Sequence, residues 1–295
     1  MQSQTAKTAY FNPYLILFLG VLFASFGSLF SRMADAAPLA IAFYRMLFTS
    51  LIVAPVALIK CKEELNSLGR REIVASLVSG VFLALHFYTW ITSLFYTTVA
   101  SSTVLVTTHP LFVVIGSYLI LKEKISAKAI FAGLVALGGV VFIGWGDFQI
   151  GQKALLGDFL AVCGAIMVAG YMLIGRKLRQ SLSVISYIFL VYSSSTVILF
   201  ILSLATATPL SSFSANTWLL FLALAVVPTI GGHSLFNWVL AYLPAPVVSI
   251  SILGEPIGAT LLALVFLGQI PSLTMLIGGS IILTGLLRFI MVTKG

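Results

Sequence analysis

Apolar residues run through the chain in blocks of about the length that a membrane-spanning helix needs, roughly 20 residues. These blocks do not alternate with a period of two, and charged or Pro/Gly/Ser-rich positions separate them. A helix satisfies its own backbone hydrogen bonds in lipid, whereas an open strand does not. We therefore predict an all-α membrane protein with ten transmembrane helices, over residues 13–31, 38–59, 73–95, 98–121, 128–145, 157–175, 183–206, 216–242, 245–267 and 272–291.

Composition supports a lipid environment. Hydrophobic residues make up 60% of the 295 residues and charged residues 8%, and no soluble globular domain has so little polar surface. The net charge of +8 does not indicate a nucleic-acid partner, because Lys and Arg form short clusters between apolar blocks. The two cysteines, Cys61 and Cys163, form neither a metal motif nor a disulfide framework. We therefore expect no metal, no cofactor and no nucleic acid.

The distribution of positive charge predicts the topology. Lys and Arg gather on the side of the membrane that carries the N-terminus, and the opposite side holds Arg32 and Lys153 alone. Because positively charged loops stay cytoplasmic, both termini are predicted to lie in the cytoplasm. The membrane is predicted to be the inner membrane of the cell.

A weak internal repeat is present. Shifting the sequence by 146 residues places His109-Pro110 on Glu255-Pro256 and Gly139 on Gly285. Since each half holds five helices, the second half enters the membrane in the opposite sense to the first. We predict two inverted repeats, residues 1–147 with helices one to five and residues 148–295 with helices six to ten.

Several short motifs resemble those of a known family. They are Phe43-Tyr44-Arg45, His109-Pro110 followed by Leu121-Lys122-Glu123-Lys124, the glycine-rich stretch from Gly133 to Gly144, and Leu253-Gly254-Glu255-Pro256. With these motifs the chain resembles the drug/metabolite transporter superfamily, specifically its EamA-type ten-helix members. The chain has Gly268-Gln269 where the family often has Gly-Glu. The resemblance implies a secondary transporter, usually an exporter of metabolites, amino acids or related molecules, that works without ATP hydrolysis.

Two charged residues lie deep inside apolar blocks, where a charge is tolerated mainly beside water or a counter-charge. Arg45 lies in the second block and Glu255 in the ninth. Arg45 could contact an anionic substrate group, form a structural ion pair or extend toward the membrane surface. Glu255 could exchange protons, or stay a neutral acid bonded to a neighbouring helix.

All three histidines also fall inside apolar blocks, and two of them share a helix face with a polar or aromatic residue four positions later. Histidine can carry protons near neutral pH, but a lone histidine on an apolar helix is often a packing group. We hypothesise a central cavity between the two halves that binds substrate, lined by Tyr44, Arg45, His86, Trp90, His109, His233, Asn237, Trp238 and Glu255. The matched prolines Pro110 and Pro256 are either hinges or kinks needed for packing.

These features predict an exporter of small metabolites, such as amino acids or related amphipathic compounds, that works by alternating access. A proton gradient or the gradient of the substrate supplies the energy, and a monomer or weak homodimer in contact with lipid suffices. A channel or a structural membrane subunit is an alternative. An intramembrane enzyme is a further one, because Gly144-Trp145-Gly146-Asp147 resembles a motif of aspartyl intramembrane proteases. That chemistry needs two carboxylates, so we name no catalytic residue.

Overall fold

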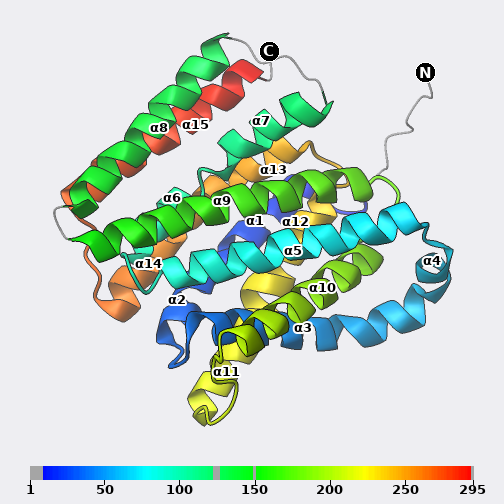
Figure 1. The fold of residues 1–295 in the computed structure, drawn as a ribbon. Helices are drawn as coiled ribbons and strands as arrows, with labels where there is room; N and C mark the ends of the chain where they lie inside the picture. Colours follow the sequence, from blue (N-terminus) through cyan, green and yellow to red (C-terminus); the bar gives the residue numbers. More distant parts are fainter. Residues whose placement is uncertain (1–8, 122–126, 149–150, 294–295) are drawn as a thin grey trace.

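The computed structural model describes residues 9–121, 127–148 and 151–293, and the regular elements in these ranges are all helical (Figure 1). The helices are α1 (Pro13–Ala24), α2 (Phe26–Met33), α3 (Pro38–Lys60), α4 (Lys62–Ser67), α5 (Arg70–Ser93), α6 (Val99–Val106), α7 (His109–Leu121), α8 (Ala127–Phe148), α9 (Gln152–Leu178), α10 (Val184–Ala205), α11 (Ala215–Leu224), the π-helix η1 (Ala225–His233), α12 (Ser234–Val239), α13 (Ala245–Ser251), the 3-10 turn η2 (Ile252–Gly254), α14 (Glu255–Leu267) and α15 (Leu273–Thr293).

Eight helical segments in the described ranges are long and apolar enough to cross a membrane. They are Pro13–Met33, Pro38–Lys60, Arg70–Ser93, Val99–Leu119, Gln152–Leu178, Val184–Ala205, Ala215–Val239 and Ala245–Leu267. Each corresponds to one of the ten predicted segments. Helices α8 and α15 cover the other two predicted segments, and the count of ten spans stays a prediction.

Helices α8 and α15 lie side by side along one edge of the molecule (Figure 1). Glycines let the two backbones approach closely, because a Cβ atom on Gly139 would come within 2.7 Å of the Gly278 carbonyl oxygen. A Cβ atom on Gly285 would likewise come within 2.7 Å of the Ala136 backbone nitrogen. Small residues at such positions are a common way to pack helices in lipid.

The interior is built around α3, α5, α9 and α10. Helix α5 packs along both α9 and α10, and α10 packs along α3 (Figure 1). Helix α1 packs against η1, and α6 against both α9 and α14. The broken helices therefore pack against one another and, through α6, against the long helix α9.

Two of the helix breaks are related by the predicted repeat. The segment predicted as one helix over 98–121 is interrupted at Thr107 and Thr108, between α6 and α7. The segment predicted over 245–267 is interrupted by η2, whose last two residues are Leu253 and Gly254. A sequence shift of 146 residues places Thr107 on Leu253 and Thr108 on Gly254, so the two breaks fall at matching positions. Each break directly precedes a residue that we predicted to bind substrate, His109 or Glu255.

The matched prolines begin helices and do not bend them. Pro110 is the second residue of α7, and Pro256 is the second residue of α14. Proline suits the first turn of a helix because the backbone N–H that it lacks has no partner within the helix there. The interruption of the helix therefore lies just before each proline, and a hinge at these positions stays a prediction.

A third break was not predicted. The segment over 216–242 contains η1, with Pro228 inside it. Proline has no N–H to donate to the carbonyl oxygen four residues earlier, that of Leu224. The hydroxyl group of Thr229 donates to that oxygen at 2.7 Å. A π-helical turn is rare and often occurs at a functional site.

Candidate functional site

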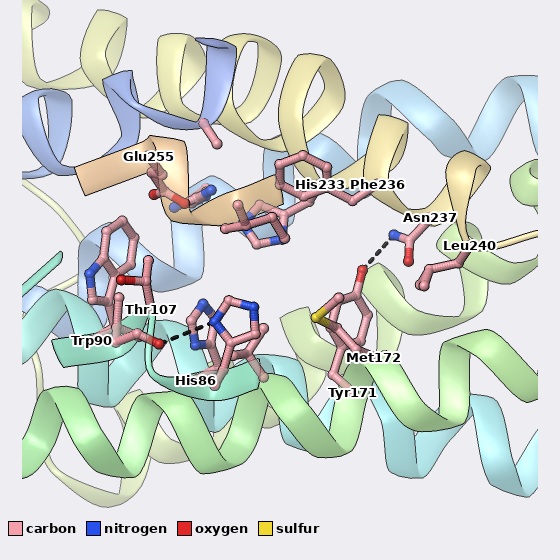
Figure 2. Close-up of a pocket in the computed structure, with 16 residues that line it drawn as sticks. His86, Trp90, Thr107, Tyr171, Met172, His233, Phe236, Asn237, Leu240 and Glu255 are labelled. Atoms are coloured by element: carbon pink, nitrogen blue, oxygen red, sulfur yellow. Dashed lines mark hydrogen bonds between the residues drawn. The ribbon is translucent and has the colours of Figure 1, made fainter. Parts of the chain in front are cut away.

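A cavity lies between α5, α6 and α9 on one side and η1, α12 and α14 on the other (Figure 2). About 40 Å³ of it can hold the centres of water molecules, which is room for about three waters. Its lining residues are Ala24, Arg45, His86, Trp90, Val106, Thr107, His109, Val168, Tyr171, Met172, His233, Phe236, Asn237, Leu240, Ile252 and Glu255. Seven of the nine residues that we predicted to bind substrate are therefore together in one place.

Arg45, on α3, is fully buried, with 1% of its surface exposed. Its Nε donates a hydrogen bond of 2.8 Å to the Thr229 hydroxyl oxygen, the same group that satisfies the carbonyl freed by Pro228. The guanidinium carbon lies 4.0 Å from the centre of the Phe87 ring and 5.9 Å from that of Trp90. An aromatic face attracts a cation, and more so away from water. The π-helix and α5 thus hold the guanidinium at the cavity.

Glu255 is the first residue of α14 and lines the same cavity. Its charge interacts with that of Arg45. The two ionisable groups that stood out in the sequence therefore belong to one site, although 210 positions separate them (255 − 45).

The three histidines also line the cavity. His86 Nδ1 is 2.9 Å from the Gly164 carbonyl oxygen, and His109 Nδ1 is 3.2 Å from that of Val106. The ring of His233 lies 6.1 Å from that of His86, between centres. Within the described residues, these histidines do not belong to any group of three or more side chains that could hold a metal ion.

Asn237 takes part in a buried hydrogen-bond network. Its amide nitrogen donates to the hydroxyl oxygen of Tyr171, and to that of Tyr192 at 3.5 Å (Figure 2). The Tyr192 hydroxyl is 3.0 Å from that of Ser234. Tyr171, on α9, was not among our predicted residues. As an aromatic residue in a largely apolar block, it carried no distinctive signal.

Tyr44 and Trp238 lie outside the cavity. Tyr44 donates a hydrogen bond to the Leu210 carbonyl oxygen and stacks on Phe221 at 4.9 Å between ring centres. Trp238 packs on Tyr242, with ring centres 4.4 Å apart. Both residues directly adjoin a lining residue in sequence, and successive side chains on a helix point about 100° apart. Because the neighbouring residue faces the cavity, these two rings face elsewhere.

Two arginines at the end of α9 hold the end of α12. Arg179 Nε donates to the Asn237 carbonyl oxygen at 2.9 Å, and Arg176 Nη1 donates to that of Leu240 at 2.6 Å. The last carbonyl groups of a helix have no partner within it, and cations stabilise that end. Since Asn237 and Leu240 line the cavity, the two arginines fix one end of it.

A carboxylate outside the apolar segments joins α4 to α10. Glu64 accepts hydrogen bonds from the backbone N–H of Ser183, at 2.6 Å, and from the hydroxyl groups of Ser183 and Ser186. Burial alone favours the protonated acid, but these hydrogen bonds and the charge of Arg179 outweigh it, so the pKa of Glu64 lies below its ordinary value. The carboxylate is therefore ionised at neutral pH and caps the start of α10.

Long apolar helices that enclose a cavity lined by charged and polar side chains are the architecture of a multi-pass membrane transporter of small molecules. The chain belongs to the EamA-like transporter family, whose sequence profile matches residues 12–145 and 155–291. The family resemblance of the motifs is thereby confirmed, and so are the membrane location and the transporter class.

Known relatives cover most of the chain. An uncharacterized transporter of Bacillus subtilis is 22% identical over 273 residues, covering 91% of this chain and 87% of that protein. An uncharacterized transporter of Clostridium kluyveri is 25% identical and covers 92% and 91%. Human solute carrier family 35 member G1 is 28% identical over 64% of this chain and 56% of its own length. A solved crystal structure has the same fold, with a TM-score of 0.68, 18% identity and coverage of 96% and 97%.

Proposed function

We propose that the protein is a secondary transporter that exports small metabolites, such as amino acids or related amphipathic compounds, by alternating access at the central cavity. The observation that carries this proposal is that Arg45 and Glu255 line one cavity. A buried cation and a half-buried acid in one pocket match the carboxylate and the ammonium group of a zwitterion. A proton gradient, with Glu255 as the exchanging group, or the gradient of the substrate itself drives the cycle.

We further propose that the ten helices form two inverted five-helix repeats, residues 1–147 and 148–295, with both termini in the cytoplasm and the chain in the inner membrane. The two separate matches to the family profile support this division. So do the two helix breaks that a single shift of 146 residues superposes. In such an arrangement the halves rock about a site at their interface, and the breaks before Pro110 and Pro256 serve as hinges.

A flux assay tests the proposal. We expect proteoliposomes with the wild-type chain to take up radiolabelled amino acids with a rate that saturates as substrate concentration rises. Saturation distinguishes a carrier from a channel, whose flux stays proportional to concentration. The variants Arg45→Gln and Glu255→Gln are expected to lower the flux at least tenfold, because each removes one charged partner of the substrate.

Matched substitutions outside the cavity serve as controls. Arg70→Gln and Glu63→Gln make the same chemical changes at exposed positions, and we expect wild-type flux from both. Flux that is absent for a broad panel of metabolites, or that is unchanged in both cavity variants, contradicts the proposed function.

A further inference from the structure

Several buried polar atoms at the cavity have no hydrogen-bond partner. Among the described residues, they include Arg45 Nη1, His109 Nε2 and Asn237 Oδ1. All three residues line the cavity, and all three are at least nine-tenths buried. A buried polar atom without a partner is rare because it has lost its water, so its presence at a cavity indicates a place where a ligand supplies the missing bond.

The histidine ring nitrogens that remain available are acceptors. A carbonyl oxygen can only accept, so the Nδ1 atom that faces Gly164 in His86 must carry the proton. The same holds for the Nδ1 atom of His109, which faces Val106. In a neutral ring, the form that an apolar interior favours, the other nitrogen then has a lone pair and no proton. Nε2 of His86 and Nε2 of His109 are therefore acceptors.

The amide of Asn237 is oriented by a chain of hydrogen bonds. Ser234 Oγ donates to the Thr229 carbonyl oxygen at 3.2 Å, so it accepts from the Tyr192 hydroxyl. The Tyr192 oxygen is then free to accept, and the Asn237 atom that faces it must be the donor nitrogen. The Oδ1 atom is the one left without a partner, and it is a third acceptor.

One of these acceptors, that of Asn237, is separated from the cation of the site. Asn237 lies at the end of the cavity opposite Trp90 and Glu255, and His86 lies between (Figure 2). Arg45, near Trp90 and Glu255, is the one cation whose side chain is among the described lining residues. Arg176 and Arg179 lie behind the lining and donate to the backbone carbonyl oxygens of Leu240 and Asn237. Along the helices, one turn separates Trp90 from His86 and one turn separates His233 from Asn237, so the two ends are roughly 10 Å apart. Aromatic rings line the space between them.

We propose that the Asn237 end of the cavity binds an N–H donor at the far end of the substrate, an ammonium or guanidinium group. The substrate class is then a basic amino acid: its α-carboxylate and α-ammonium group meet Arg45 and Glu255, and its side-chain cation meets Asn237, His86 and His109. This inference rests on the proposed function and narrows its substrate. Three neutral acceptors and nearby aromatic faces stabilise a cation without adding a second charge to the cavity.

Binding of two amino acids of nearly equal shape tests the inference. L-Lysine and L-norleucine differ in the terminal ammonium group, and isothermal titration calorimetry of the purified full chain in detergent measures both affinities. We expect the wild type to bind lysine at least tenfold more tightly than norleucine. Asn237→Leu is expected to weaken lysine binding at least fivefold and to change norleucine binding less than twofold. Asn237→Asp, which keeps an acceptor oxygen, is expected to retain the preference for lysine.

A second cavity variant and a matched control keep the test decisive. His109→Phe removes a different acceptor and is expected to reduce the preference for lysine if Asn237→Leu does not fold. Asn66→Leu makes the same change as Asn237→Leu at an exposed position of α4, and we expect it to bind like the wild type. Equal wild-type affinity for the two amino acids, no binding of either, or full lysine preference in both cavity variants overturns the inference.

The inference and the proposed function can fail separately. Proteoliposomes that transport norleucine and lysine with equal saturable rates leave the transporter proposal standing and overturn the basic-amino-acid inference. Selective binding of lysine without any flux supports the basic-amino-acid inference and contradicts the transporter proposal.

Discussion

Arg45 shows how a charged side chain is kept inside an apolar protein. The contacts that hold its guanidinium group are the Thr229 hydroxyl and the faces of Phe87 and Trp90. Thr229 has a double role, since its hydroxyl also replaces the N–H that Pro228 cannot donate. The Thr229 side chain therefore satisfies a backbone carbonyl group of its own helix and also orients the guanidinium group of Arg45.

Replacing Thr229 tests this double role. Thr229→Val has nearly the same shape but no hydroxyl, so Arg45 loses its acceptor and the Leu224 carbonyl loses its donor. We expect a rise of about tenfold in the KM of transport, corresponding to about 1.4 kcal/mol, with near-normal membrane insertion. Thr229→Ser restores the hydroxyl, and its KM should lie within threefold of the wild-type value. A normal KM in the valine variant contradicts this role of Thr229.

Glu64 gives a prediction about pH. Because the pKa of its carboxyl is lowered in the folded protein, the hydrogen bonds to Ser183 and Ser186 stabilise the fold above the ordinary Glu pKa of about 4.3. That contribution disappears as the pH falls through the lowered pKa. We expect Glu64→Gln to lower the thermal unfolding temperature at pH 7, and this difference from the wild type to shrink toward pH 3. The exposed neighbour variant Glu63→Gln should unfold like the wild type throughout.

At the scale of single residues, the sequence was informative where a polar group interrupts an apolar block. Arg45, Glu255 and the three histidines stand out for that reason, and all of them line the cavity. Aromatic residues carry no such signal, because an apolar helix presents them to lipid, to the core and to a cavity alike. Tyr44 and Trp238 were therefore expected at the site but lie elsewhere, while Tyr171 was missed.

Among the helices, the pair of α8 and α15 depends on glycine. The space beside Gly139 is filled by the backbone of α15, whereas a Cβ atom on the preceding Gly138 would meet nothing within 4 Å. We expect Gly139→Ala to destabilise the protein by about 1–3 kcal/mol, because the backbone of α15 must move away. Gly138→Ala serves as the control, and a slightly higher unfolding temperature is expected for it, since alanine favours a helix. Equal unfolding temperatures for the two variants contradict this packing.

The long helices were predictable because length and hydropathy determine them. Pro110 and Pro256 indicated two of the interruptions, but the form of the third, around Pro228, was not predictable. A transmembrane segment tolerates proline or threonine without breaking when neighbouring groups satisfy the backbone. Whether Pro228 bends, widens or ends its helix depends on what the Thr229 hydroxyl and Arg45 supply from across the structure. Such long-range partners cannot be read from the local sequence.

For the molecule as a whole, the predicted orientation leads to a labelling experiment. Single-cysteine variants in a background without Cys61 and Cys163 are treated in intact cells with a thiol reagent that does not cross the membrane. We expect Lys153→Cys and Asp35→Cys to react from outside, and Lys62→Cys and Lys177→Cys to react after the membrane is opened. Labelling of Lys62→Cys in intact cells contradicts the proposed topology.

The small size of the cavity has a consequence for the timing of transport. Space for about three water molecules is less than any amino acid fills, so no such cargo can enter while the helices are arranged as they are here. Loading must separate η1, α12 and α14 from α5, α6 and α9, which form the two sides of the cavity. Binding and opening are therefore coupled, because the substrate enters only as these helices separate.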